Sequence, residues 1–403
     1  MNATANAAAI TAPQPARAGH GGAVLALLSC GHFFIDWYAA ALSALLPLLV
    51  VKLNLTLTQA GMLAGLLLFS SSVMQPVYGY LSDRFPTWLF TALAPMVAGV
   101  FISALGLAPN YAALLLLAVL GGAGIASFHP QASAQASLCM RFSAGRSMAF
   151  FITSGTLGLA LGPTCFSLLS GWLGLERIYW AAVPGVLVSA LLIGFLPEMT
   201  SFPHLASPRT AWRALRAVWT PMVLLYLLVF VRSVVQITFT QFLPLYLSRE
   251  RLFSLAQSNY ILSIYLLAGA FGGLVGGHLA DRLGGRIVII ISMIGSVPFL
   301  ALFLMADGWL SVAGLAAGGL VLLFTIPVNV VMAQQLAPAQ AGTVSALMMG
   351  FGWGMAGLVF TPLTGWISDL YSIHTALSLL VVFPVAGFFL ALALPKRHGA
   401  PAN

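Results

Sequence analysis

Charged residues, prolines and glycines divide the chain into apolar runs, each long enough to cross the hydrocarbon core of a bilayer as a helix. We expect twelve spans, at 22–51, 56–81, 88–108, 111–139, 145–173, 178–197, 219–247, 257–281, 286–306, 309–335, 341–369 and 373–395. The runs are too long for barrel strands and lack the alternating pattern that such strands need. Because only helices and closed barrels satisfy the whole backbone within lipid, the sequence predicts an all-α membrane protein.

Composition excludes a soluble fold. Hydrophobic residues make up 60% of the chain and charged residues only 6%, whereas soluble domains are about 25% charged. A chain with this low share of charged residues cannot build a water-facing surface. Soluble enzymes, nucleic-acid binders and secreted disulfide scaffolds are therefore excluded. The net charge of +8 does not indicate a nucleic-acid partner, because the basic residues are scattered in short loops.

One long interruption between apolar runs divides the chain into two halves. It contains prolines and arginines and separates the sixth span from the seventh. We therefore expect a disordered cytoplasmic tail over 1–21, a six-helix half over 22–197, a cytoplasmic linker over 198–218, a second six-helix half over 219–395 and a tail over 396–403.

Basic residues predict the orientation, because they concentrate in cytoplasmic loops. Placing the N-terminus inside leaves few basic residues in the outer loops, namely Lys52, Arg177, Arg249 and Arg251. The inner loops and tails then hold Arg17, Arg84, Arg141, Arg146, Arg209, Arg213, Arg216, Arg282, Arg286, Lys396 and Arg397. We expect a monomer in a bacterial inner membrane, surrounded by lipid, with both termini cytoplasmic.

A short motif occurs once in each half. Gly79 to Arg84 reads GYLSDR at the end of the second span, and Gly277 to Arg282 reads GHLADR at the end of the eighth. Both copies fit G-x-L-x-D-R, and we expect both in the loop before the third helix of their half. Two similar halves in one membrane chain are typical of secondary transporters, whose substrate site lies between the repeats.

The repeated motif resembles the signature loop of the major facilitator superfamily, and the repeat extends this resemblance over the whole chain. The resemblance implies twelve helices in two pseudo-symmetric halves that rock about a central site. In such transporters the acid and the arginine of the motif hold neighbouring helix ends together in one of two access states. The resemblance therefore implies a gating role for Asp83, Arg84, Asp281 and Arg282.

The fifth span carries small residues on one helix face. Gly155, Gly158 and Gly162 follow at i, i+3 and i+7, where absent side chains let a neighbouring helix approach closely. Gly158, Gly162 and Pro163 resemble the glycine-proline motif that antiporters of the superfamily carry in this helix, which favours export and gating at these residues. Ordinary small-residue packing is the alternative.

Four further segments resemble the fosmidomycin-resistance branch of the superfamily. They are GHFFID at 31–36, the pattern LxLTxxQxG at 53–61, SSxxQP at 71–76 and FHP at 128–130. The branch has Glu where this chain has Gln131. The loss of that carboxylate bears on both the proton stoichiometry and the substrate.

Charged groups inside a membrane are functional candidates. Asp36 is the acid that lies deep within a span, and His32 precedes it by one helical turn on the same face. Asp36, His129 and Arg232 lie at about the same depth, roughly 20 Å along their helices at ~1.5 Å per residue. Spans one, four and seven line the cavity in the superfamily, so we expect these groups to meet there, with Asp36, His32 and His129 carrying protons.

Arg232 is the candidate anion-binding group, because a guanidinium presents a fork of donors to carboxylate, phosphate or phosphonate. Gln236 and Thr240 continue its helix face. The full set of expected substrate-binding residues is Arg232, Asp36, His129, Gln131, Gln236 and Gln75. A permanent ion pair of Asp36 with Arg232 or His32, which would only hold the protein together, is the structural alternative.

These features predict a proton-coupled exporter of a small anionic or amphiphilic compound, not an enzyme, with no cofactor and no bound metal. The chain has no G-x-x-x-x-G-K-[ST] motif, so ATP is not the expected energy source. Two alternatives stay open. One is an importer or facilitator of an organic anion on the same fold. The other is a divalent-metal carrier or intramembrane metalloenzyme that uses His32, Asp36 and His129.

Overall fold

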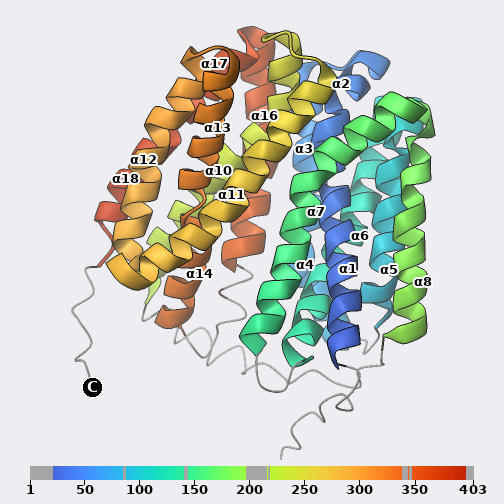
Figure 1. Cartoon of the computed structure of the whole chain (residues 1–403), viewed down its shortest axis with the longest axis horizontal. Helices are drawn as coiled ribbons and strands as arrows, with labels where there is room; N and C mark the ends of the chain where they lie inside the picture. The colour runs from blue at the N-terminus through green and yellow to red at the C-terminus, as the bar shows by residue number, and fades with distance from the viewer. Residues whose placement is uncertain are drawn as a thin grey trace, which may run out of the picture.

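The computed structural model describes residues 21–84, 88–139, 144–196, 216, 218–337, 344 and 347–395. Every regular element in these ranges is a helix, and the helices run roughly side by side in one bundle (Figure 1). The expected linker lies almost wholly outside the described residues, as do both expected tails except for Gly21.

The N-terminal half forms one side of the bundle, in blue to green in Figure 1. Its helices are α1 (Gly21–Ala39), α2 (Ala41–Leu53), α3 (Leu57–Leu68), the π-helix η1 (Phe69–Val73), α4 (Gln75–Arg84), α5 (Leu89–Ser103), the 3-10 helix η2 (Ala104–Leu107), α6 (Tyr111–Leu138), α7 (Ala144–Leu173), the 3-10 helix η3 (Leu175–Ala181) and α8 (Ala182–Phe195).

The C-terminal half forms the other side, in yellow to red. Its helices are α10 (Trp219–Arg249), α11 (Leu255–Leu283), α12 (Gly285–Met305), α13 (Gly308–Leu322), α14 (Thr325–Leu336), the π-helix η5 (Leu347–Phe351), α16 (Gly352–Leu370), α17 (Ile373–Leu380) and α18 (Val382–Leu392).

Helix lengths agree with the expected spans. Eleven segments of the described residues are long and apolar enough to cross a membrane. The remaining expected span, 341–369, corresponds to η5 and α16, and it begins among residues that the structure does not describe. The expected position of the repeated motif is wrong in detail, because both copies lie within the last turns of α4 and α11 rather than in loops.

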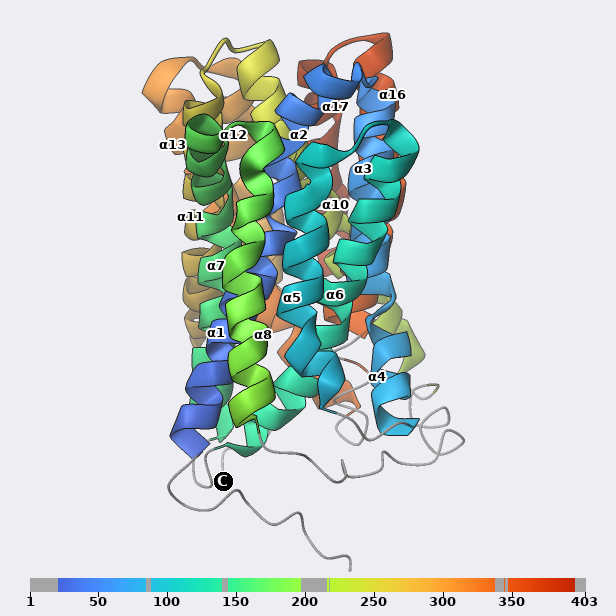
Figure 2. The ribbon, with the colours of Figure 1, turned by 90° about the vertical axis from the view of Figure 1, so that its right-hand side faces the viewer.

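The two halves meet mainly along α3 with α16, α7 with α11, and α2 with α10. Figure 2 shows α3 beside α16, with α17 near the end of the bundle away from the chain termini. Glycines make the α3–α16 contact close: a Cβ atom on Gly61 would lie 2.2 Å from the carbonyl oxygen of Thr361, and one on Gly365 would lie 2.1 Å from that of Leu57. We call the end of the bundle away from the chain termini the far end, and this seam runs from the far end towards the middle.

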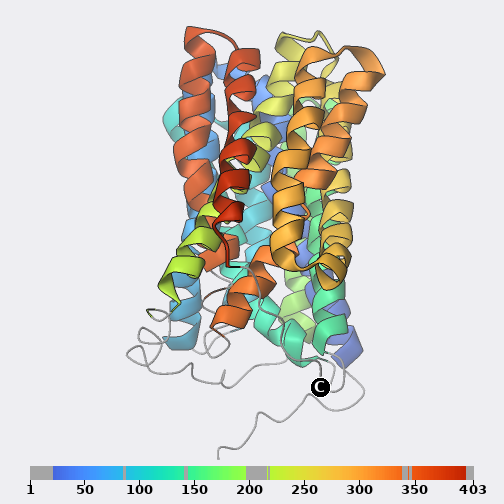
Figure 3. The ribbon, with the colours of Figure 1, turned by 90° about the vertical axis from the view of Figure 1, so that its left-hand side faces the viewer.

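Both ends of the described chain lie at the opposite end of the bundle (Figure 3). The start of α1 and the end of α18 are found there, as are the last turns of α4 and α11. In this conformation, therefore, the halves are joined at the end away from the termini.

Candidate functional site

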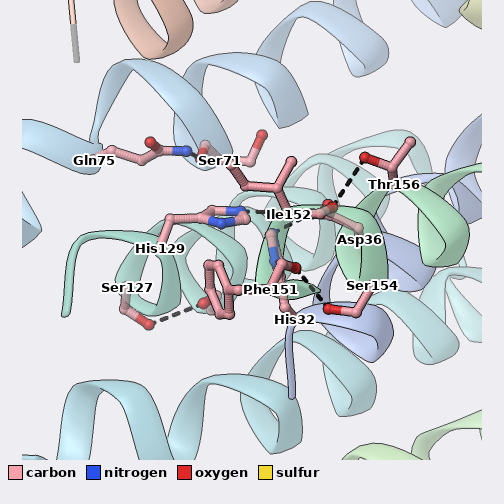
Figure 4. A network of polar contacts seen from close by, with 11 residues as sticks. His32, Asp36, Ser71, Gln75, Ser127, His129, Phe151, Ile152, Ser154 and Thr156 are labelled. Atoms are coloured by element: carbon pink, nitrogen blue, oxygen red, sulfur yellow. Dashed lines mark hydrogen bonds and ion pairs between the residues drawn. The ribbon is translucent and has the colours of Figure 1, made fainter. Parts of the chain in front are cut away.

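Three ionisable side chains of the N-terminal half gather between α1, α6 and α7 (Figure 4). Nε2 of His32 lies 3.4 Å from Oδ2 of Asp36, and Nε2 of His129 lies 3.6 Å from Oδ1 of the same carboxylate. His32 and Asp36 share a helix face because they are one turn apart on α1. The single carboxylate therefore lies between two imidazoles. We name these three residues the proton cluster, after the role that the sequence predicts for them.

The backbone of α7 fixes the ring of His32. Its Nδ1 lies 2.8 Å from the carbonyl oxygen of Phe151, and the two rings stack with centroids 4.1 Å apart. Because a carbonyl oxygen only accepts, Nδ1 carries the hydrogen, and a neutral ring then leaves Nε2 as an acceptor. Two acceptors, Nε2 and Oδ2 of Asp36, repel each other unless a proton or cation joins them. The contact is therefore stable when a proton or a cation lies between these two atoms.

A glycine leaves the room that the proton cluster occupies. A Cβ atom on Gly155 would lie 2.5 Å from Oδ2 of Asp36 and 2.5 Å from Nε2 of His32. Further along α7, Gly158 and Gly162 face the backbone of α1, where added Cβ atoms would lie 2.0 Å from the carbonyl oxygen of Phe33 and 2.9 Å from that of Trp37. The small-residue face of α7 thus receives α1, and Pro163 lies within α7 just after it.

The cluster also has the composition of a metal site. His32, Asp36 and His129 each offer a ligand atom, and these atoms lie within 4.8 Å of one another. Two imidazoles and a carboxylate suit a divalent transition metal, and the carbonyl of Phe151 orients the ring of His32 as an outer partner would.

Arg232 stands on α10 in the other half and is only 5% exposed. Its Nη1 donates to Oε1 of Gln236 at 2.5 Å, and its guanidinium lies 5.6 Å from the ring centroid of Trp353 on α16. Its buried Nε has no hydrogen-bond partner. Within the described ranges, no ion pair joins Arg232 to a carboxylate. The guanidinium is therefore a buried cation with donors to spare.

The expected meeting of Asp36 with Arg232 does not occur in this conformation. The ion pairs of Asp36 are with His32 and His129, whereas Arg232 is held by Gln236 of its own helix. Of the two structural locks considered from the sequence, only the one between Asp36 and His32 is formed. Depth along a helix does not fix the direction in which a side chain points.

The expected glutamine ligands have different surroundings. Gln236 contacts Arg232 directly. Gln75 donates from Nε2 to the carbonyl oxygen of Ser71 at 3.0 Å. Figure 4 shows both residues in the same view as the proton cluster. Gln131 instead accepts from the Thr91 hydroxyl of α5 at 3.0 Å and is 3% exposed. Its oxygen therefore joins two helices of one half, and its role in substrate binding stays a prediction.

The expected gating residues of the repeated motif lie at the end of the bundle that holds the chain termini. The exposed Arg84 donates to the hydroxyl of Tyr80 on its own helix at 3.2 Å. Asp281 and Arg282 are exposed at the end of α11. Asp83 belongs to α4, and its side chain lies outside the description. The contacts found for Arg84 stay within its own half.

Sequence reasoning missed several members of both sites. The carbonyl of Phe151 has no sequence signature, because any residue supplies one. Trp353 is one of nine tryptophans, and nothing in the sequence distinguishes it. Tyr265 on α11 is fully buried, its hydroxyl has no partner, and it lies close enough to Arg232 to interact electrostatically. The one signal that the sequence offered for Tyr265 is its polar hydroxyl within an apolar run.

Known proteins resemble this chain over its whole length. The family model described as Major Facilitator Superfamily matches residues 28–252 and 225–403. The Fosmidomycin resistance protein of Escherichia coli (strain K12) is 28% identical over 387 residues, covering 93% of each chain. The uncharacterized MFS-type transporter YfnC of Bacillus subtilis (strain 168) is 29% identical over 383 residues, with the same coverage.

A solved structure agrees with the fold. An inward-facing, unoccupied bacterial homologue of the human lysosomal transporter Spinster superposes with a TM-score of 0.80 at 16% identity, covering 96% of this chain and 100% of that one. The fold and the two resemblances drawn from the sequence, to the superfamily and to its fosmidomycin-resistance branch, are thereby confirmed.

Proposed function

Since the chain belongs to the Major Facilitator Superfamily, we propose that it is a secondary active transporter that exports a small anionic or amphiphilic compound in exchange for protons. It works by alternating access, in which the halves rock about a site between them. It acts as a monomer in a bacterial inner membrane, with both termini cytoplasmic. The end joined by α3 and α16 then faces outward.

The buried Arg232 carries the proposal. A buried charge is stable only when it is paired and its hydrogen-bonding groups are satisfied. Gln236 supplies one neutral acceptor, and Nε stays unpartnered. An anionic substrate completes the site by accepting from the free donors of the guanidinium. The ring of Trp353 contributes a flat apolar wall beside it, which suits an amphiphilic molecule.

The proton cluster supplies the coupling. Asp36 lies between two imidazoles in the half that does not hold Arg232, so proton and substrate are bound by different halves. Proton binding neutralises the carboxylate and lets His32 and Asp36 attract each other. Proton loss returns a negative charge to the cluster. The same rocking of the two halves changes the access of both the cluster and the substrate site.

Export is the proposed direction. Gly158, Gly162 and Pro163 resemble the antiporter motif, and this glycine face packs directly on α1, which carries His32 and Asp36 of the proton cluster. The Escherichia coli relative bears the name of a resistance protein. An organic-anion importer would use the same Arg232 site, with the gradient driving accumulation inside.

A divalent metal ion is the second candidate cargo, because three ligand atoms of the proton cluster lie within 4.8 Å of one another. The two cargoes can be distinguished because each depends on binding residues in a different half of the protein. Anion transport depends on Arg232, whereas metal transport depends on His129 and is indifferent to Arg232.

Transport by purified protein in liposomes with an imposed pH gradient tests the proposal. The panel contains phosphonates, organic acids, cationic drugs and divalent metal ions, and Arg232→Gln is measured beside the unmodified protein. We expect gradient-driven movement of an anion that Arg232→Gln abolishes. Movement of cationic drugs alone, or full activity of Arg232→Gln on the transported anion, contradicts the proposal.

A further inference from the structure

The first turn of α3 is completed by a residue from the other half of the protein. A helix begins with backbone N–H groups that have no partner within the helix. The hydroxyl of Thr56 accepts from the third of these, on Gln59, and the side chain of Gln59 accepts from the backbone of Thr56. The first two N–H groups, on Leu57 and Thr58, donate instead to the carboxylate of Asp369 at 2.8 and 2.7 Å.

Asp369 reaches α3 from the last turn of α16 in the C-terminal half. Its Oδ2 also accepts from the Thr58 hydroxyl at 2.6 Å, so one carboxylate receives three hydrogen bonds. The contact is charge-assisted, and the positive end of the α3 dipole adds to it. About two turns of α16 from Asp369, in the same seam, the Thr361 hydroxyl lies 2.9 Å from the carbonyl oxygen of Gly61 on α3 and 2.7 Å from that of Gly357 in its own helix. The α3–α16 seam thus contains polar contacts between the halves, and Asp369 supplies the charged one nearest the far end.

A second acid at the same end performs the same chemistry without crossing between halves. The carboxylate of Glu250, which follows α10, accepts from the backbone N–H groups of Ile373 and His374 at 2.6 and 2.9 Å. These N–H groups open α17, which belongs to the same half as α10. Movement of one half relative to the other leaves the Glu250 contact intact but separates Asp369 from α3.

We propose that Asp369 is a latch that holds the two halves together at the end of the bundle away from the chain termini. While the latch is closed, all three of its hydrogen bonds are made. Parting of α3 from α16 transfers two backbone N–H groups, a hydroxyl and a carboxylate to water. The latch therefore favours the conformation described here over the one open at the far end. It rests on these contacts alone and requires neither the proposed substrate nor proton coupling.

Distance measurement between spin labels tests the latch without any substrate. Labels are placed at Leu107→Cys and Trp309→Cys, exposed positions at the far end of the two halves. The background has the native cysteines, Cys30, Cys139 and Cys165, replaced by alanine. The two label positions move apart when the far end opens.

We expect Asp369→Ala to raise the ratio of long to short distances about tenfold or more, because charge-assisted bonds are lost. Asp369→Asn keeps the size and one acceptor, so a smaller rise is expected. Glu250→Gln is the matched control and should leave the ratio within about twofold, since its contact does not cross the halves. Size-exclusion elution and helical circular dichroism confirm that each variant is folded.

An unchanged ratio in Asp369→Ala overturns the inference. An equal rise in Glu250→Gln also overturns it, because that result assigns the effect to general loosening of the far end. Should Asp369→Ala not fold, Thr58→Val supplies the second variant: it removes one bond to Asp369 and leaves the backbone bonds in place, so a rise of a few-fold is expected and no rise counts against the latch. Failure of transport with an intact latch response counts against the proposed function alone.

Discussion

The two halves of the bundle place charge in opposite ways. In the N-terminal half, Asp36 is enclosed by its own partners, since both histidines face it and α7 holds one of them through a backbone carbonyl. In the C-terminal half, Arg232 has one neutral partner from its own helix and a buried donor with none. One half therefore satisfies its charge internally, and the other leaves its charge incomplete.

This difference indicates what each half binds. The proton cluster is closely packed around His32 and Gly155, so the particle that we propose it binds is as small as a proton. An incomplete cation needs a larger partner that brings its own acceptors. The proposed function therefore assigns protons and substrate to different halves, linked by the movement of one half against the other.

Arg232→Gln should have the largest effect, because it removes the unsatisfied charge that distinguishes the C-terminal half. Loss of one partner from a buried, hydrogen-bonded charge pair weakens binding by at least about 30-fold. Arg232→Lys keeps the charge but not the fork of donors, so we expect an intermediate loss. Equilibrium binding of the transported anion to purified protein measures both. Equal affinity in all three proteins would remove the distinction between the halves.

Asp36→Asn should separate coupling from binding. The amide has the shape of the carboxylate but does not take up a proton at neutral pH, so a pH gradient can no longer drive accumulation. Exchange of labelled for unlabelled substrate across the membrane without a gradient should persist, because Arg232 is unaltered. Liposome assays with and without the gradient measure the two activities. Loss of both in a folded variant would mean that Asp36 binds substrate or supports the structure.

The sequence predicts features that depend on local spacing. The helices follow from the length of the apolar runs, and the approach of His32 to Asp36 follows from one turn of helix. The close contact of the glycine face of α7 with another helix follows from three small residues on one side. Each of these inferences needs only the geometry of a single helix.

Other features depend on how the helices are rotated and paired, which spacing does not determine. Gln131 points to Thr91 on α5, although it follows directly after the HP pair of α6. Asp369 reads as an ordinary acid at a helix end, yet it caps a helix of the other half. Backbone groups such as the carbonyl of Phe151 leave no trace in the sequence, so their contribution to a site is visible only in the folded chain.

Gly155→Ala should disturb the contacts between His32 and Asp36 without changing any residue of the proton cluster. A methyl group there would lie 2.5 Å from both Asp36 and His32, so the cluster or α7 must shift. Overpacking of this kind costs about 1–3 kcal/mol, and we expect gradient-driven transport to fall about tenfold while anion binding at Arg232 is retained. Gly171→Ala on the same helix is the control, because its Cβ atom would meet nothing within 4 Å. Similar losses in both variants would point to a general intolerance of α7 to substitution.

Trp353→Leu should have the smallest effect and tests whether the incomplete cation receives help from an aromatic face. The guanidinium of Arg232 lies 5.6 Å from the ring centroid of Trp353, and such contacts contribute about 0.5–1 kcal/mol. We therefore expect the dissociation constant of the bound anion to rise about two- to fivefold. Trp366→Leu, an exposed position on the same helix, should leave it unchanged. If Trp353→Leu instead approaches the loss seen in Arg232→Gln, the tryptophan is a principal substrate contact, and the C-terminal site recognises an aromatic or apolar group as strongly as it recognises charge.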